Sequence, residues 1–205
     1  MTAQEIIDYA ISSELKQLSL KNDNTTIISF INLGLIELYK RFEIEYSEAL
    51  ISTITVKTTY LLDGTDTDVQ LGSTNGVITI VKAIDYQGME LPINEDNAIW
   101  GVYTPSYDSV QIPATYDGDW LNIIFKTLPK RVINTTDEVR LPVQLLEPLL
   151  LYIGWKGHQS INGSINQENN AYYMRFKSSC DNATYNGVIT PDSYRTIDIE
   201  YKGFI

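Results

Sequence analysis

Residues 141–161, LPVQLLEPLLLYIGWKGHQSI, decide how the C-terminal part of the chain folds. Their apolar side chains predict one helix that begins near Val143 or Glu147 and ends at Ile161. After a break at Asn162-Gly163, Ser164–Gln167 fits a capping box for a second helix, which is predicted to run to about Asn186 and to stop at Gly187. The side chains expected to be buried on it are Tyr172, Phe176, Cys180 and Ala183. Because the connection is so short, we expect the two helices to pack antiparallel.

The first of these helices contains the only histidine of the chain, His158. A catalytic imidazole needs a positioned partner, and Ser160, two residues further on, would not face it on a helix. We therefore expect His158 to complement the helix dipole near the C-terminal end. Gly154 and Gly157 would let neighbouring helices approach closely, and with Trp155 they are the candidate helix-packing residues.

Helical signals also mark the N-terminal end. Thr2 and Glu5 fit a capping box in front of a first helix. A second helix with one apolar face begins near Thr25, and Lys40 and Arg41 lie near its end, where cations complement the helix dipole.

From about Ile51 the apolar period changes to two, which predicts strands over residues 51–58 and a buried strand over Val77–Ala83. The clearest local signal is a β-hairpin. Its strands are Ser109–Thr115 and Trp120–Thr127, with Asp117-Gly118 at the centre of the turn. Short strands at this spacing imply a small antiparallel sandwich or barrel.

The order of these signals predicts an α+β protein. Helices from residues 1–48 and from residues 141–188 would form one helical bundle. Residues 49–140 would form an inserted β-sandwich or barrel module, and residues 189–205 an extended tail.

The composition limits the classes of function. The chain has 205 residues and a net charge of -11, and so acidic a surface disfavours binding nucleic acid through its phosphates. The N-terminus lacks the pattern of a signal peptide. The longest apolar run, Pro148–Trp155, is far short of the roughly 20 residues that span a bilayer, so no membrane association is expected.

Few side chains suggest chemistry. With one cysteine and one histidine the chain cannot form a Cys/His zinc site, and Cys180 is expected to be a packing residue. The acidic stretch Asp63–Asp68 lacks the order of a calcium-binding loop and is interpreted as a turn. Asp117 and Asp119 flank a predicted turn. The sequence predicts no catalytic residues, metal or cofactor.

The last residues of the chain alternate in a strand-like pattern without an obvious partner. Thr196, Asp198, Glu200 and Lys202 alternate with apolar side chains. The tail is therefore a candidate for binding a neighbouring subunit or another protein by strand addition, with pairing to the chain's own β module as the alternative. The candidate contact residues are Tyr194, Ile197, Ile199, Tyr201 and Phe204.

This order of elements resembles the head-to-tail adaptor proteins of tailed phages, most closely the tail accessory or tail tubular A type of short-tailed phages. The most specific part is the pair of helical segments at 141–161 and 166–188. The Asn-, Ile- and Tyr-rich composition also resembles that of crAss-like phages.

The resemblance implies a non-enzymatic virion protein in the neck region, assembled in the host cytoplasm. It implies a homo-oligomeric ring, a dodecamer, that docks beneath the portal protein and surrounds part of the DNA channel. The C-terminal tail would reach the portal, so its candidate contact residues would bind the portal or a neighbouring subunit. Downstream tail, ring or fibre proteins would attach to the β modules, and double-stranded DNA would pass through without specific binding.

Two other functions stay open. In the first, the β module binds carbohydrate or acts in adhesion, with Trp100, Tyr103 and Tyr107 as an aromatic platform. In the second, the protein is a carboxylate-dependent hydrolase that uses Asp117 and Asp119.

Overall fold

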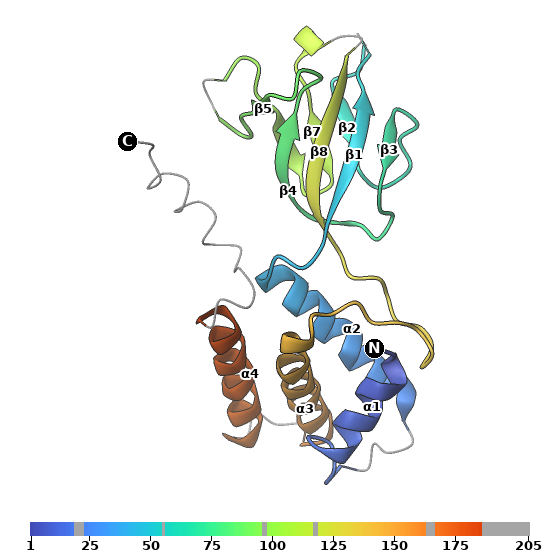
Figure 1. Ribbon diagram of the computed structural model, residues 1–205, viewed down its shortest axis with the longest axis vertical. Coiled ribbons are helices and arrows are strands. Elements are labelled where there is room, and N and C mark those ends of the chain that lie inside the picture. Colours follow the sequence, from blue (N-terminus) through green and yellow to red (C-terminus); the bar gives the residue numbers. More distant parts are fainter. Residues whose placement is uncertain (19–22, 55, 96–97, 117–118, 163–166, 186–205) are drawn as a thin grey trace. The chain divides into compact units, whose positions relative to one another are not determined.

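The chain is mixed α+β, and its elements divide between two compact units (Figure 1). Met1–Ile44 and the described residues from Pro129 onward form the helical unit, and Glu45–Leu128 forms the β unit. The computed structural model describes residues 1–18, 23–54, 56–95, 98–116, 119–162 and 167–185.

The helical unit contains four α-helices in its described part. They are α1 (Ala3–Ser12), α2 (Asn24–Arg41), α3 (Leu146–Asn162) and α4 (Gln167–Tyr185), and a short 3-10 turn, η2 (Val143–Leu145), precedes α3. The capping box predicted for α1 is confirmed, because the Thr2 amide donates to Glu5 and the Glu5 amide donates to the Thr2 hydroxyl. Asp23 caps α2 by accepting from the Thr26 amide at 3.0 Å.

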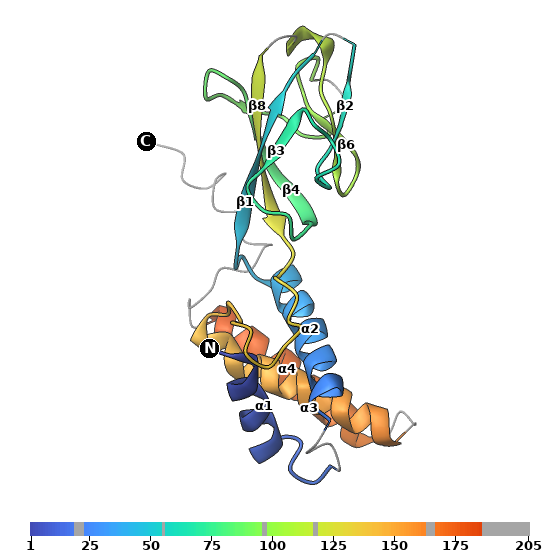
Figure 2. The same cartoon turned by 90° about the vertical axis from the view of Figure 1, so that its right-hand side faces the viewer.

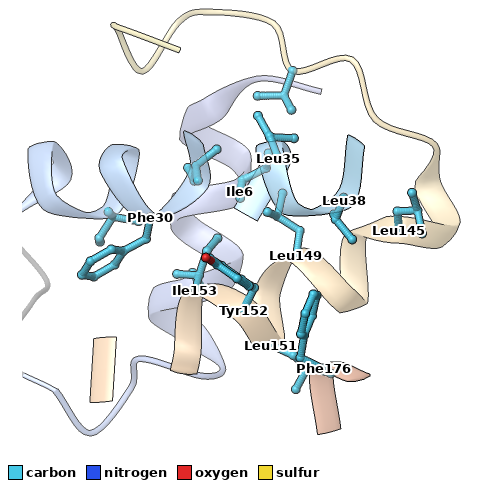
Figure 3. Close-up of a cluster of buried hydrophobic side chains, with 14 of the residues drawn as sticks. Ile6, Phe30, Leu35, Leu38, Leu145, Leu149, Leu151, Tyr152, Ile153 and Phe176 are labelled. Carbon is cyan, nitrogen blue, oxygen red and sulfur yellow. The ribbon is translucent and has the colours of Figure 1, made fainter. Parts of the chain in front are cut away.

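One apolar core holds these helices together. Figure 3 shows side chains of α2, such as Leu35 and Leu38, on the same core as Leu149 of α3. Gly34 of α2 leaves room for side chains of α3. A methyl group placed there would lie 2.6 Å from the Leu149 Cδ1 and 3.1 Å from the Tyr152 ring. No local pattern in the sequence singles out this glycine.

α3 and α4 run antiparallel. The His158 ring, late in α3, lies 4.6 Å from the Tyr172 ring, early in α4. The Tyr152 ring, one and a half turns earlier in α3, lies 5.3 Å from the Phe176 ring, further along α4. Phe176, Cys180 and Ala183 are buried as expected, whereas Tyr172 is only partly buried.

The β unit consists of two antiparallel sheets. The first has the order β3-β1-β8-β4-β5 and the second the order β2-β7-β6. Figure 2 shows β2 and β6 beside β1 and β8. The strands are β1 (Tyr46–Ser52), β2 (Thr59–Leu61), β3 (Val69–Leu71), β4 (Val77–Ile84), β5 (Glu90–Leu91), β6 (Tyr103–Ser106), β7 (Ser109–Gln111) and β8 (Trp120–Thr127).

Alternation along the strands builds the core of the β unit. In β1, Ala49 and Ile51 are buried while Leu50 is exposed, and β8 alternates in the same way. The buried side chains of β1 and β8 share one core with Tyr60 and Val110 of the second sheet. The other face of the five-stranded sheet is therefore its outer face.

The predicted hairpin is wrong. β7 pairs with β2 and β6 in one sheet, whereas β8 pairs with β1 and β4 in the other. Pro113 has no amide to donate to a ladder, and the chain then turns through a 3-10 turn, η1 (Ala114–Tyr116). Asp117-Gly118 lies outside the described residues.

The predicted strand over residues 51–58 is also wrong beyond Ser52. The Lys57 amide donates to the Ile54 carbonyl at 3.1 Å, so the chain turns there instead of continuing the strand. The strand predicted over Val77–Ala83 is confirmed as β4, although most of its side chains are only half-buried.

The boundaries of the β unit differ from the predicted range of 49–140. The β unit begins at Glu45 and so includes the first residues of β1. Residues from Pro129 belong to the helical unit. Val132 and Val139 pack in the helical core, and the Ala3 amide donates to the Asp137 carbonyl at 2.9 Å. The apolar residues of this irregular segment carried no periodic signal that would assign them to the helices.

The contact at Gly34 gives a first prediction. Gly34→Ala should lower the free energy of unfolding by about 1–2 kcal/mol, because overpacking of the core outweighs the gain of about 1 kcal/mol in helix propensity. Urea denaturation followed by circular dichroism measures the change. Leu33→Ala, at an exposed position of the same helix, should change it by less than about 0.5 kcal/mol. Equal effects of the two substitutions would contradict the close approach.

Candidate interaction surfaces

His158 is a packing residue. Its ring stacks on Tyr172 with an angle of 19° between the planes, and its Nε2 lies 3.3 Å from the Glu14 carbonyl oxygen. The imidazole therefore joins α3 to α4 and to the segment after α1, which is a structural use of the ring.

The predicted helix-packing residues of α3 lie within this same cluster. A methyl group at Gly154 would lie 2.9 Å from the Glu14 Cβ and 3.2 Å from the Tyr172 ring, and Gly157 is buried. Trp155 is half-buried, with its ring 4.8 Å from that of Tyr173. In the described part of the chain, α3 thus meets other elements of its own chain at these positions.

Cys180 is buried in the core of the helical unit. Burial raises the pKa of its thiol to about 12, although the nearby Arg41 acts in the opposite direction. The thiol is therefore protonated at neutral pH and is not a nucleophile there.

A groove of about 410 Å³ lies between the N-terminal half of α3 and the C-terminal half of α4. Its charged side chains are Glu147 and Arg175, and Leu151 and Ala183 line its apolar part. Arg175 also lies 3.8 Å from the Glu14 carboxylate. One carboxylate and one guanidinium do not make a nucleophile with its base, so this groove gives no argument for catalysis.

The loop between β1 and β2 presents apolar side chains to solvent. Val56 is 96% exposed and Ile54 is 45% exposed. The loop is nevertheless held firmly, because the buried Tyr60 hydroxyl accepts from the Ile54 amide and donates to the Lys57 carbonyl, each at 3.0 Å. Ile54 and Val56 are therefore candidate contact residues on a backbone that is held at Ile54 and Lys57.

Charged groups fix the other side of this loop. The Lys57 ammonium binds the carboxylates of Asp66 and Asp68, and it lies 4.8 Å from the centre of the Tyr60 ring. Burial alone would raise the pKa of Asp66. Hydrogen bonds from Lys57 and from the amides of Leu61 and Asp68 outweigh burial and lower that pKa.

The carboxylates of the acidic stretch Asp63–Asp68 therefore bind other groups of the same chain. Asp66 and Asp68 bind an ammonium group, and Asp63 accepts from the Thr65 amide and hydroxyl. Within the described residues, no group of three His, Cys, Asp or Glu side chains could hold a metal ion.

Two further exposed apolar side chains lie on the outer face of the five-stranded sheet, near the end of β1 from which this loop starts. Ser52 pairs with Trp120 and Leu50 pairs with Asn122, so Leu50 and Trp120 are diagonal neighbours on this face. They are 39% and 47% exposed. We call Leu50, Ile54, Val56 and Trp120 together the apolar end of the β unit.

The structure describes most of the residues of the two alternative functions, but not Asp117. Trp100 and Tyr107 are exposed, but Tyr103 is half-buried and donates its hydroxyl to the Glu95 carbonyl at 3.0 Å. Asp119 is described, and its backbone carbonyl accepts from the Thr53 hydroxyl at 2.7 Å. Its proposed catalytic partner Asp117 lies outside the described residues.

The candidate contact residues of the tail also lie outside the described residues. They are Tyr194, Ile197, Ile199, Tyr201 and Phe204. No helix in the described part of the chain has both the length and the apolar character needed to cross a membrane. Comparison with protein-family models and with curated proteins finds no match to this chain.

The network around Lys57 predicts a dependence of stability on pH. The pKa of Asp66 is lower in the folded state than its usual value near 3.9, so the ionised carboxylate stabilises the fold above about pH 4. This contribution is lost as the pH falls through the folded-state pKa. Asp66→Asn should therefore lower stability at pH 7 by roughly 1–3 kcal/mol and flatten its decline between about pH 4 and pH 2.

Urea midpoints measured across this pH range test the prediction. Asp181→Asn removes an exposed carboxylate of α4 and is the matched control. If the acid dependence of Asp66→Asn equals that of the wild type and of the control, the ion pair with Lys57 does not stabilise the β unit.

Proposed function

We propose that the protein is a structural subunit of a tailed-phage virion. It forms a ring beneath the portal that joins the capsid to the tail and surrounds part of the DNA channel. In this proposal the helices form the bundle of the ring, and the β unit is a module inserted between them that binds further tail, ring or fibre proteins. The protein has no catalytic activity.

The observation that carries the proposal is the apolar end of the β unit. Exposed aliphatic and aromatic side chains at one end of a folded unit are candidates for contact with a partner. Val56 is almost fully exposed, yet the backbone on both sides of it is held by Tyr60 and Lys57. A preorganised apolar surface supports a role in protein assembly.

Two further observations support a connector. The side chains that carry reactive groups, His158, Cys180 and the Asp63–Asp68 stretch, are used for packing or for ion pairs within the fold. The net charge of -11 would repel DNA from the walls of a channel, so that DNA passes without sticking. The resemblance of residues 141–161 and 166–188 to phage adaptors gives the specific position beneath the portal.

Oligomeric state tests this proposal directly. The full chain, alone and mixed with the portal protein encoded by the same genome, should form a closed ring, and for twelve chains of 23.2 kDa light scattering should give about 280 kDa. Negative-stain images should show the ring docked on the portal. A strict monomer that does not bind the portal would overturn the proposal.

The apolar end of the β unit has its own test. Val56→Glu should weaken binding of the adjacent tail or fibre protein at least tenfold, since it places a charge in the centre of an apolar interface. Val143→Glu makes the same change at an exposed position of the helical unit and should leave that binding unchanged. If both variants bind like the wild type, while the ring still forms, the tail proteins attach elsewhere.

A further inference from the structure

Within the described part of the chain, the edge of β4 that faces away from β8 is unpaired over most of its length. β4 runs from Val77 to Ile84, but β5 pairs only with Ala83 and Ile84. β8 occupies the other side of β4 (Figure 1). Among the described residues, therefore, no strand lies beside Val77–Lys82 on the outer side. Six residues at about 3.3 Å each give an open edge of roughly 20 Å.

The composition of this edge favours strand pairing. Val77 to Val81 reads VITIV, and every one of these residues is β-branched. The pairing register between β4 and β8 shifts twice, between Val77 and Thr79 and between Ile80 and Lys82. Such bulges and the edge residue Lys82 limit unspecific pairing, so a partner strand must match this edge in its side chains.

The two faces of the edge have different chemistry. Ile80 packs against the core between the two sheets and is only partly buried. Thr79 is exposed, and Lys82 lies on the outer face, where its ammonium binds Glu90 at 2.8 Å. A matching strand would place apolar side chains beside Ile80, on the face of the sheet that meets the core. It would place hydroxyl or acidic side chains beside Thr79 and Lys82, on the outer face.

The segment Arg195–Lys202 of the same sequence has this pattern. Ile197, Ile199 and Tyr201 form one set of alternate positions. The other set contains Thr196, Asp198, Glu200 and Lys202. Nine residues, 186–194, connect α4 to this segment, and they span up to about 30 Å when extended.

We propose that the segment Arg195–Lys202 of one copy adds a strand to the open edge of β4 in a neighbouring copy. Its apolar residues cover Ile80, and Asp198 or Glu200 lies within reach of Lys82. This inference rests on the proposed ring, because a ring places identical copies side by side. A strand donated from each copy to the next is a head-to-tail contact, which closes a ring of identical subunits.

Disulfide trapping between two different single-cysteine chains tests the proposal. One chain carries Thr79→Cys at the edge of β4, and the other, enlarged by a tag, carries Thr196→Cys or Glu200→Cys. Oxidation of the mixture should give the mixed dimer several-fold faster than the same experiment with Thr59→Cys, which places the thiol at the edge of β2. The natural Cys180 is buried and can stay, and the wild-type chain measures its background.

A charge exchange sharpens the test. Lys82→Glu should reduce trapping by Glu200→Cys several-fold through repulsion from Asp198, and Asp198→Lys in the partner chain should restore it. A disulfide within one chain, obtained from the double variant Thr79→Cys/Glu200→Cys as a monomer, would show that the tail pairs with its own β unit and would overturn the exchange between copies.

The oligomeric state of the same samples separates the two proposals. If rings form but Thr79→Cys is trapped no faster than Thr59→Cys, the strand exchange is wrong and the proposed function stands. If the chain is a strict monomer and no mixed dimer forms, both are overturned. Rings together with the mixed dimer support both.

Discussion

The close packing of α3 is the constraint on which the helical unit depends. α3 contacts α1, α2 and α4, so it must be approached from several sides at once. Gly34 of α2 leaves room for Leu149 on one side, and Gly154 leaves room for Glu14 and Tyr172 on another. Because protein interiors are packed to crystal-like density, a side chain at either glycine would push apart elements that share one core. The other helices can pack on α3 only because these two glycines leave room for its close contacts.

The chain enters and leaves the β unit at the same end of one strand pair. The β unit begins and ends in paired strands, with Tyr46 opposite Lys126 and the Thr127 amide donating to the Glu45 carbonyl at 3.3 Å. The two points where the chain enters and leaves are therefore adjacent, as they are in domains that tolerate insertion. At the other end of the same strand pair, Ser52 lies opposite Trp120, roughly 20 Å further along β1. Within the β unit, Leu50 and Trp120 thus lie toward the end of this strand pair that is opposite the entry points.

The sequence predicted those features that depend on local chemistry. The capping box at Thr2 needs only a hydroxyl and a carboxylate three residues apart, and the helix over α3 follows from its own apolar spacing. The mixed α+β class followed from the change in period along the chain. The hairpin prediction failed because an Asp-Gly pair describes a turn but does not say which sheet each flanking strand joins. Pro113 was the residue that argued against it.

Other features depend on contacts between distant residues and left no local signal. Gly34 is one glycine inside a long helix, and its role is set by Leu149, which is more than a hundred residues away. The alternation over residues 51–58 suggested a strand, but the Tyr60 hydroxyl turns the chain and exposes Val56. The candidate binding surface on the loop therefore could not be found from the sequence. An exposed valine looks the same in a sequence as a buried one.

Several polar groups of the two units have clear structural roles. The Lys57 ammonium forms ion pairs with the carboxylates of Asp66 and Asp68. The Tyr60 hydroxyl is hydrogen-bonded to two backbone groups, and the His158 ring stacks on Tyr172. Each of these groups contributes to the packing or the hydrogen bonding of its own unit. Apolar side chains such as Val56 are exposed on the β unit at the same time. Contacts between residues far apart in the sequence therefore decide both which polar groups are engaged and which apolar side chains reach solvent.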